Sequence, residues 1–186
     1  MRVHLYNGSL DLVGRSGVGQ AFFHQKAMLE QAGVTVTESW QGHSDAVHIN
    51  TVLPDAVFAA LRAHLRGETV VYYGHSTMQD FRDSFPGSNL LAPVFRQWLR
   101  FCYRVGDFII TPTPYSRSIL ESYHLHRPIY DLTNGVDTDF FAPDPARRAA
   151  FRQTYQLEEN TPVVVSAGHY FVRKGVLDFI ELARAM

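Results

Sequence analysis

The sequence predicts an α/β protein built on a Rossmann-like, doubly wound parallel sheet. Short apolar runs alternate with amphipathic helical patterns along the whole chain, which is typical of a sheet whose parallel strands are joined by helices. A glycine-rich loop at residues 14–19 separates the first strand pattern from the first helix pattern. Ligands of such sheets bind beyond the carboxyl ends of the strands, so the loops at those ends are the place to look for function.

The strand patterns are short and rich in β-branched and aromatic residues. Strands are expected at residues 3–6, 34–40, 46–52, 69–73, 108–111, 128–132 and 162–168. The helices between them are bounded by glycine and proline. Helices are expected from the glycine loop to Ala32, from Pro54 to Gly67, and at residues 93–105, 116–123, 147–157 and 174–186.

In the helix that starts at Pro54, helical spacing relates Val57, Phe58, Leu61 and Leu65, which we expect to form its apolar face. Residues 74–90 are rich in Ser, Asp and Gly and predict a long irregular loop. Such loops inside a compact domain are more often functional than idle.

The chain is long enough for one full domain but short for two. We expect residues 1–157 to form the first domain and residues 158–186 to be the first strand–helix unit of a second, truncated domain. A single strand–helix unit cannot bury both faces of its strand, so we expect the chain to be a fragment. Because its second domain is incomplete, we also expect this chain to be inactive alone.

Composition excludes several classes of protein. A net charge of −1 argues against a general nucleic-acid binder. Cys102 is the only cysteine, so no intrachain disulfide can form and a reducing compartment is favoured. The start lacks a signal-peptide pattern, and no apolar run reaches the roughly 18 residues of a spanning helix. We expect a cytoplasmic protein, with any membrane contact peripheral and on the inner face.

A turn at residues 133–143 carries the most specific pattern. Asn134-Gly135 tolerates positive φ, and Asp137 and Asp139 follow it. Phe140-Phe141 then reads as an apolar plug that holds the turn in place.

This segment closely resembles the N-G-V-D-x-x-x-F-x-P segment of retaining glycosyltransferases of family 4, which have the GT-B fold. The resemblance covers nearly the whole chain, from Ser16-Gly17-Val18-Gly19 to Arg173-Lys174-Gly175. The section from His75-Ser76 to Tyr115-Ser116 is most similar to bacterial enzymes that add a hexose to glucosyl-diacylglycerol. The resemblance implies the N-terminal, acceptor-binding domain of such an enzyme, with Asn134, Gly135 and Asp137 at the interdomain cleft.

The glycine loop has three interpretations. By resemblance, Gly17, Val18 and Gly19 face the cleft and contact donor phosphate or acceptor. A dinucleotide site competes, with Glu38 near the distance for a ribose contact, but the spacing is G-x-x-G-x-G and not G-x-G-x-x-G. Close packing of helix on strand also explains such glycines.

His75 follows a central strand and a glycine, a position that favours a site role over a simple backbone hydrogen bond. By resemblance, it contacts the acceptor or the transferred sugar, and Ser76, Tyr115 and Ser116 bind substrate. A general base is not implied, because the leaving phosphate is thought to take the acceptor proton in the family.

No metal and no cofactor are expected. Asp80 and Asp83 alternate with Arg82 and two phenylalanines, which is no recognisable ligand spacing. The family also generally transfers sugar without a bound metal. The phenylalanines fit a lipid contact or loop anchors equally well.

Residues 93–105 form the clearest amphipathic pattern. Val94, Trp98 and Phe101 share one broad apolar arc with Phe95, Leu99, Cys102 and Val105, and a basic stripe of Arg96, Arg100 and Arg104 lies opposite. Either the stripe is a solvated face, or it is the side of the helix that faces anionic lipid.

Arg173 and Lys174 open the last helix pattern and could neutralise the diphosphate of a leaving nucleotide. In the family an arginine directly follows the strand glycine, where this chain has His169, while Lys174 matches the family's lysine. We expect transfer of a hexose from a UDP-sugar to a glycolipid acceptor with retention. A non-catalytic nucleotide-binding domain, or transfer to a protein or polysaccharide, are the alternatives.

Overall fold

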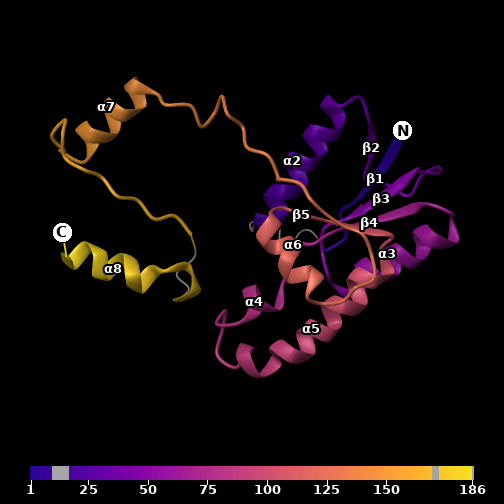
Figure 1. The fold of residues 1–186 in the computed structure, drawn as a ribbon. Helices are drawn as coiled ribbons and strands as arrows, with labels where there is room; N and C mark the ends of the chain where they lie inside the picture. Colours follow the sequence, from indigo (N-terminus) through magenta and orange to yellow (C-terminus); the bar gives the residue numbers. More distant parts are fainter. Residues whose placement is uncertain (10–16, 169–171, 186) are drawn as a thin grey trace. The chain divides into compact units, whose positions relative to one another are not determined.

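The computed structural model describes residues 1–9, 17–168 and 172–185, without the side chain of Arg173. Contacts divide the chain into an N-terminal unit, Met1–Gly135, and a C-terminal unit, Val136–Met186 (Figure 1). Each unit is described by itself. The expected domain boundary after residue 157 stays a prediction.

The N-terminal unit is built on one parallel sheet, as predicted. Its six strands lie in the order β2-β1-β3-β4-β5-β6, and every neighbouring pair is parallel. The strands are β1 Arg2–Tyr6, β2 Thr35–Thr37, β3 Ala46–Ile49, β4 Thr69–Tyr73, β5 Phe108–Thr111 and β6 Ile129–Asp131. Strands β2 and β3 flank β1 on opposite sides, so the strand order reverses there.

Helices cover both faces of this sheet (Figure 1). They are α2 Gly17–Gln31, α3 Pro54–Leu65, α4 Met78–Phe81, α5 Ser88–Val105 and α6 Pro114–Glu121. Right-handed crossovers place α3, α5 and α6 on one face and α2 on the other, because the chain moves from β1 to β2 in the opposite direction. The doubly wound architecture is therefore confirmed.

Helix α3 packs on the sheet through small side chains. Its buried residues are Ala56, Val57, Ala59, Ala60 and Ala63, and they pack with alternate residues of β3 and β4. The expected apolar face is wrong for three of its four members, because Phe58, Leu61 and Leu65 are 71%, 48% and 90% exposed. Alanine carries no large hydrophobic signal in a sequence pattern, yet it lets a helix approach a sheet closely.

Residues 74–90 are more regular than expected. They include α4, which Thr77 caps by accepting a hydrogen bond from Asp80 N, and the first turn of α5. The phenylalanine Phe81 stacks on Phe95 at 4.3 Å between ring centroids, which makes it a loop anchor. Helix α5 starts five residues before the expected position, because Pro93 is accommodated within it.

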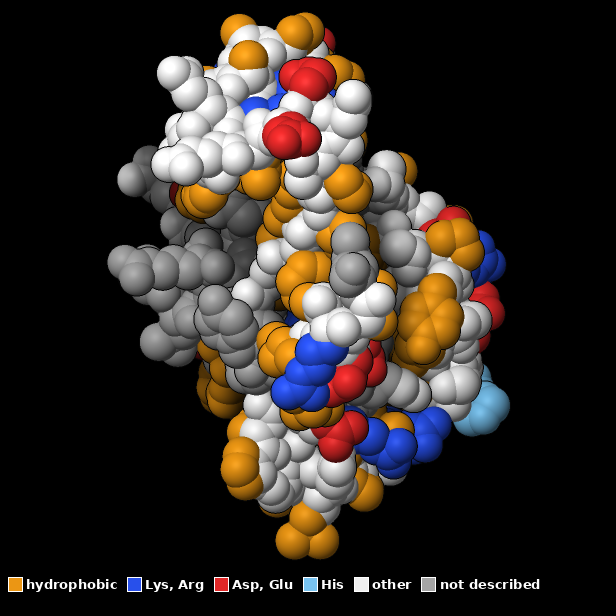
Figure 2. All heavy atoms as spheres, turned by 90° about the vertical axis from the view of Figure 1, so that its left-hand side faces the viewer, with side chains coloured by type: hydrophobic (Ala, Val, Ile, Leu, Met, Phe, Trp, Pro, Cys, Tyr) orange, Lys and Arg blue, Asp and Glu red, His pale blue; other side chains and the backbone are white. Residues whose placement is uncertain are grey.

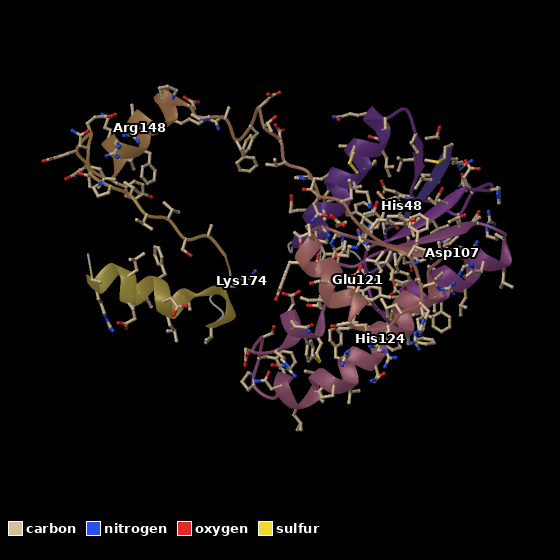
Figure 3. The ribbon with its side chains drawn as sticks, viewed as in Figure 1. His48, Asp107, Glu121, His124, Arg148 and Lys174 are labelled. Atoms are coloured by element: carbon tan, nitrogen blue, oxygen red, sulfur yellow. The ribbon has the colours of Figure 1, made fainter. Side chains whose placement is uncertain are left out.

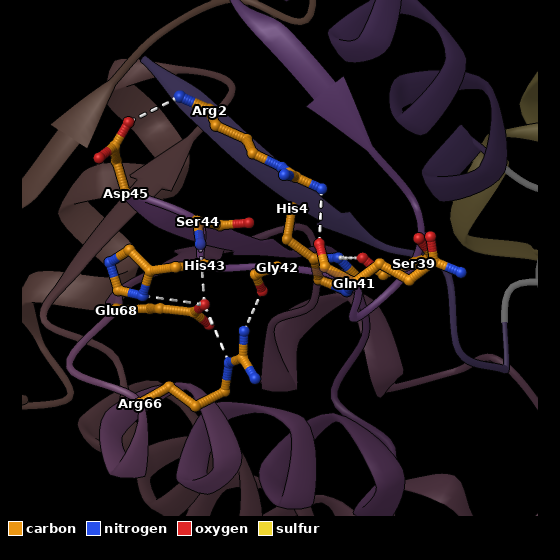
Figure 4. Close-up of polar contacts among 10 residues, drawn as sticks. All are labelled: Arg2, His4, Ser39, Gln41, Gly42, His43, Ser44, Asp45, Arg66 and Glu68. Carbon is orange, nitrogen blue, oxygen red and sulfur yellow. Dashed lines mark hydrogen bonds and ion pairs between the residues drawn. The ribbon is translucent and has the colours of Figure 1, made fainter.

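The amino ends of the strands are held by ion pairs and by hydrogen bonds to backbone atoms (Figure 4). The carboxylate of Glu68 is almost fully buried and accepts from Ser44 N and Arg66 Nε, at 2.9 and 3.0 Å. Arg66 also donates to Gly42 O, and Arg2 N donates to Asp45 at 2.7 Å. These contacts fix the crossing from β2 to β3 at the edge opposite the candidate site.

The C-terminal unit contains α7 Pro145–Thr154, the 3-10 turn η1 Val172–Lys174 and α8 Val176–Ala185. The strand expected at residues 162–168 is wrong for this structure. Val163, Val164 and Val165 are exposed, and among the described residues no strand pairs with them. A strand forms only beside a hydrogen-bonded neighbour, whatever its apolar character.

Candidate functional site

The candidate site lies at the carboxyl edge of the sheet. Because the strands are parallel, the segments that follow β1, β3, β4, β5 and β6 all meet at this edge. The point between β1 and β3, where the strand order reverses, is the usual ligand position in such sheets. The sequence-predicted residues of the N-terminal unit, namely Gly17, Val18, Gly19, His75, Ser76, Tyr115, Ser116, Asn134 and Gly135, all follow these strand ends.

A group of buried polar side chains occupies this edge on the face covered by α2. This polar cluster consists of Gln25 from α2, His48 and Asn50 from β3 and its end, and Tyr73 and His75 from β4 and its end. Figure 3 shows His48 inside the N-terminal unit. Gln25 and Asn50 are each 3% exposed, so the cluster belongs to the interior.

Hydrogen bonds run through the cluster from helix to strand end. Asn50 Nδ2 donates to Gln25 Oε1 at 2.8 Å, and Asn50 Oδ1 lies 2.9 Å from His75 Nε2. The hydroxyl of Tyr73 lies 3.5 Å from His48 Nδ1, and the Tyr73 and His75 rings stack with centroids 5.8 Å apart. His75 is therefore held by a contact with Asn50 and by stacking on Tyr73, and Asn50 is held in turn by Gln25.

Burial keeps the cluster uncharged near neutral pH. It lowers the pKa of His75 to about 4 and the pKa of His48 to about 4, because the charged imidazolium loses its hydration. It also raises the pKa of Tyr73 to about 12. His75 is thus a neutral imidazole, with one nitrogen that donates a hydrogen bond and one that accepts.

Gly74 allows His75 to take its position. Its N–H donates to Ile110 O at 2.7 Å, and its carbonyl accepts from Thr111 Oγ1 at 3.1 Å. A Cβ added here would lie 2.6 Å from Leu120 Cδ1, so a larger residue fits only if the Leu120 side chain shifts.

The predicted substrate residues Ser76, Tyr115 and Ser116 have clear structural partners. Tyr103 OH donates to Ser76 O at 2.7 Å, and the Ser76 N–H donates to the Tyr103 hydroxyl at 3.3 Å. Ser116 forms a capping box with Thr113 at the start of α6 and accepts from Thr111 Oγ1 at 2.7 Å. Tyr115 is 73% exposed. Their substrate roles stay predictions.

The glycine loop lies partly outside the described residues, since 10–16 are not described. Gly17, Val18 and Gly19 form the first turn of α2. Gly19 is buried against the sheet, as the packing interpretation expects, whereas a Cβ at Gly17 would meet nothing within 4 Å. Among the described residues of this loop, Gly17 therefore has open space beside it.

Gly135 takes the expected positive φ, 77°, and its N–H donates to Thr133 Oγ1 at 3.2 Å, but the expected turn at Asn134-Gly135 is wrong for this structure, in which the turn lies at residues 138–141. Asp137 Oδ1 accepts from Asp139 N and Phe140 N at 3.1 and 2.8 Å, so this carboxylate caps the following turn. The expected apolar plug is wrong, because Phe140 and Phe141 are 60% and 68% exposed. They contact each other edge to face at 5.0 Å.

In the C-terminal unit, Lys174 ends η1 and has an exposed side chain just before α8 (Figure 3). The Arg173 side chain and His169 lie outside what the structure describes. The diphosphate role of Lys174 and Arg173 stays a prediction.

The basic stripe of α5 does not form the free face that the sequence suggests. Arg96 donates to Ser122 O at 3.0 Å and Arg104 to His124 O at 2.8 Å, and Arg96 lies over the Tyr123 ring. These guanidinium groups therefore bind carbonyls near the end of α6, where cations are favoured. Arg100 donates to Gln97 Oε1 at 3.1 Å.

The apolar arc of α5 also differs from expectation. Leu99, Cys102 and Tyr103 are buried, but Val94 and Phe101 are 69% and 52% exposed. Trp98 is half-buried and donates to Val52 O at 2.7 Å. The exposed face of α5, defined here as Leu90, Leu91, Val94 and Phe101, is therefore apolar and the arginines flank it.

Sequence reasoning missed Gln25, His48, Asn50 and Tyr73. A signal was present, since His48 and Asn50 alternate at the end of β3 as Tyr73 and His75 do at the end of β4. Alternate residues of a strand point to one face, so both polar pairs are directed toward the same side of the sheet.

The fold and the polar cluster define an α/β protein with a candidate ligand site at the carboxyl edge of a parallel sheet. The sequence model of Glycosyltransferase Family 4 matches residues 21–140, more than half of the chain. This chain belongs to that family.

Two individual proteins are similar in sequence to this chain. The chain is 39% identical over 187 residues to a processive diacylglycerol α-glucosyltransferase from Acholeplasma laidlawii, an alignment that covers 100% of this chain and 55% of the relative. It is 38% identical over 86 residues to a GDP-mannose-dependent α-(1-6)-phosphatidylinositol monomannoside mannosyltransferase from Mycolicibacterium smegmatis, covering 46% of this chain and 22% of the relative. The chain thus spans about half the length of the first of these relatives.

The fold also matches two solved structures of one protein. Anabaena HepE in complex with UDP-glucose aligns with a TM-score of 0.54 at 14% identity, covering 84% of this chain and 50% of that protein. HepE in complex with UDP and glucose aligns with a TM-score of 0.50. At this identity the likeness concerns the fold alone, and it supports the expected N-terminal half of a GT-B architecture.

Proposed function

We propose that this chain is the acceptor-binding half of a hexosyltransferase that moves a hexose from a UDP-sugar to a glycolipid such as glucosyl-diacylglycerol. The observation that carries the proposal is the polar cluster, in which a neutral His75 is held at the carboxyl edge of the sheet. The glycolipid preference is supported by the two lipid-modifying relatives, one of which aligns with the whole chain.

In the proposed reaction, an acceptor hydroxyl oxygen forms a bond to the anomeric carbon of the donor hexose. The bond from that carbon to the diphosphate breaks, the configuration is retained, and the proton passes to the leaving phosphate oxygen. His75 and the first turn of α2 bind the acceptor and the hexose. Lys174 and Arg173 stabilise the diphosphate as its negative charge grows.

No metal takes part in this proposal. Within the described ranges, no group of three or more His, Cys, Asp or Glu side chains is placed to hold a metal ion. In this proposal, the charge of the diphosphate is stabilised by Lys174 and Arg173 of the C-terminal unit.

We further propose that the protein acts in the cytoplasm and touches the inner membrane face through α5. No helix in the described part of the chain is long and apolar enough to cross a bilayer. The exposed face of α5 places Leu90, Val94 and Phe101 on one line, and Arg100 and Arg104 lie beside that line. Figure 2 shows hydrophobic side chains at its lower end, where α4 and α5 lie.

The direct test of function is sugar transfer from UDP-glucose to glucosyl-diacylglycerol in mixed micelles. We expect transfer from a longer form of the protein that carries a donor-binding domain, and none from the 186-residue chain alone. Transfer by the 186-residue chain would overturn the expectation of inactivity. Absence of transfer from the longer form to any lipid would overturn the proposed function.

Isothermal titration of the longer form separates the alternatives. Binding of UDP without NAD supports the proposal, and binding of NAD would favour a dinucleotide-binding domain. Transfer to a polysaccharide or a protein, without transfer to lipid, would show that the acceptor class is wrong and that the proposed reaction is right.

A further inference from the structure

The strongest unexplained feature of the polar cluster is the pair of buried amides behind His75. Asn50 and Gln25 are each 3% exposed, come from different elements, and are bonded to each other at 2.8 Å. Burial of two amides costs free energy unless their polar atoms make hydrogen bonds, and the hydrogen bond between Asn50 Nδ2 and Gln25 Oε1 offsets part of that cost.

The hydrogen bond between the two side-chain amides determines which atom of Asn50 faces His75. Asn50 uses Nδ2 to donate to Gln25 Oε1, which leaves Oδ1 directed at His75 Nε2, 2.9 Å away. A carbonyl oxygen only accepts. With the amides in this orientation, the Nε2 atom carries the hydrogen.

In a neutral imidazole, a hydrogen on Nε2 leaves Nδ1 with a lone pair. Burial lowers the pKa of His75 to about 4, so the ring is neutral under ordinary conditions. Among the described residues, the Nδ1 atom makes no hydrogen bond, and the ring is stacked on Tyr73 with centroids 5.8 Å apart.

We propose that Asn50, itself held by Gln25, is a positioning residue that fixes His75 as the Nε2–H tautomer and presents Nδ1 as a hydrogen-bond acceptor for a substrate hydroxyl group. The part that concerns the substrate rests on the proposed function. The substrate group recognised here is a donor, that is, a free sugar or glycerol hydroxyl, and not a phosphate or carbonyl oxygen.

The tautomer can be read directly from the protein. In a long-range ¹H–¹⁵N NMR experiment on histidine labelled with ¹⁵N, the resonances of His75 are assigned by their loss in His75→Gln. We expect Nε2 at a proton-bearing position and Nδ1 at a lone-pair position, with the Nε2–H form in about tenfold excess, the ratio that one net hydrogen bond provides. A dominant Nδ1–H form would mean that both amides are turned over, and it would overturn the proposal.

Variants separate positioning from general structure. Asn50→Ala removes the acceptor and is expected to reduce the tautomer ratio about tenfold. Asn50→Asp keeps an acceptor and is expected to retain the Nε2–H form. Gln25→Leu frees the Asn50 amide and is expected to reduce the ratio, while Gln25→Glu retains it. Asn160→Ala, an exposed amide in the C-terminal unit, is the matched control.

The resonances of His48 show whether a variant keeps its fold, because His48 lies in the same cluster. An unchanged ratio in folded Asn50→Ala would overturn the proposal. If Asn50→Ala does not fold, the proposal is still tested by the tautomer ratio of the wild type and by the comparison of Gln25→Leu with Gln25→Glu.

A final experiment tests the positioning role of Asn50 separately from the proposed function. Micelles of glucosyl-diacylglycerol, compared with micelles of diacylglycerol, are expected to shift the Nδ1 resonance because a hydroxyl donates to it. If the Nε2–H tautomer is found but the Nδ1 resonance does not shift, the positioning role of Asn50 is supported and the glycolipid acceptor is not. If the Nδ1 resonance shifts but the Nε2–H tautomer is absent, the positioning role is overturned and the glycolipid acceptor is still supported.

Discussion

The indole Nε1 of Trp98 donates a hydrogen bond of 2.7 Å to the backbone oxygen of Val52. This bond joins the middle of α5 to the segment that precedes α3, and Cys102 Sγ approaches the same oxygen at 3.8 Å. Trp98 therefore holds two helices together on one face of the sheet.

We predict that Trp98→Phe lowers the free energy of unfolding by about 1 kcal/mol, because the Val52 carbonyl loses a partner while most of the apolar contact remains. Urea denaturation followed by the fluorescence of Trp40 measures this change. Tyr115→Phe removes an exposed hydroxyl and serves as the control without effect. An unchanged midpoint in Trp98→Phe would contradict the anchoring role.

Gly74→Ala is predicted to destabilise the N-terminal unit by about 1–3 kcal/mol, the usual cost of overpacking. The new Cβ would lie 2.6 Å from Leu120 Cδ1. Leu120→Ala in the same chain removes that clash, so the double variant should lose less than the sum of the two single losses. Strict additivity in denaturation would show that Leu120 is not the obstacle.

Gly17→Ala is predicted to leave stability unchanged, because the added Cβ meets nothing within 4 Å and alanine favours a helix. Ligand binding should weaken, since the methyl group occupies the space beside the first turn of α2. Thermal denaturation and titration with the acceptor measure the two effects separately. A destabilised but binding-competent variant would favour the packing interpretation of this glycine.

Stability is predicted to fall as the pH drops from 7 towards 4. Burial lowers the pKa of His48 from 6.5 to about 4. Below pH 6.5 the unfolded chain binds a proton that the folded chain does not, so the free energy of unfolding decreases by up to about 1.4 kcal/mol per pH unit for this residue. His75 adds to the slope in the same direction.

In His48→Gln, the free energy of unfolding should depend less steeply on pH between pH 6 and pH 5, by a slope that corresponds to up to about one proton taken up on unfolding. Urea denaturation at several pH values gives the slope, and the comparison of slopes does not depend on the cost of the substitution itself. The exposed His124→Gln is the control. Equal slopes in His48→Gln and the wild type would contradict a buried, neutral His48.

Binding to anionic vesicles is predicted to depend on the exposed face of α5. Replacing Leu90 and Val94 together by serine should weaken vesicle binding at least about tenfold, since each apolar side chain contributes on the order of 1–2 kcal/mol when buried. Co-sedimentation measures this loss. Thr154→Ser, on α7, should bind as the wild type does, and equal pelleting of all three proteins would remove α5 from the membrane proposal.

The parallel sheet was predictable because each of its strands carries β-branched or aromatic residues between glycine or proline boundaries, as in Thr69–Tyr73. The inward face of α3 was not, since Ala60 and Ala63 pack on the sheet while Phe58 remains exposed. Pattern reasoning weights large side chains, whereas the distance between helix and sheet selects small ones.

Within the site, His75 was predictable from its place after Gly74 at a strand end. Asn50 and Gln25 were not, because their role depends on a bond between α2 and the end of β3, which are distant in sequence. The arginines of α5 show the same limit. Helical spacing places them on one stripe, but only the position of α6 gives Arg96 and Arg104 their carbonyl partners.

The central claim, that the N-terminal unit recognises a sugar-bearing lipid at the carboxyl edge of its sheet, is tested most directly by equilibrium binding to nanodiscs. Discs with glucosyl-diacylglycerol are compared with discs that hold diacylglycerol only, for the wild type, His75→Ala and the control His124→Ala. We predict tighter binding to the sugar-bearing discs, reduced about tenfold in His75→Ala by loss of one hydrogen bond and unchanged in His124→Ala. Equal affinity of the wild type for both discs, or a sugar preference that survives in His75→Ala, would contradict the account.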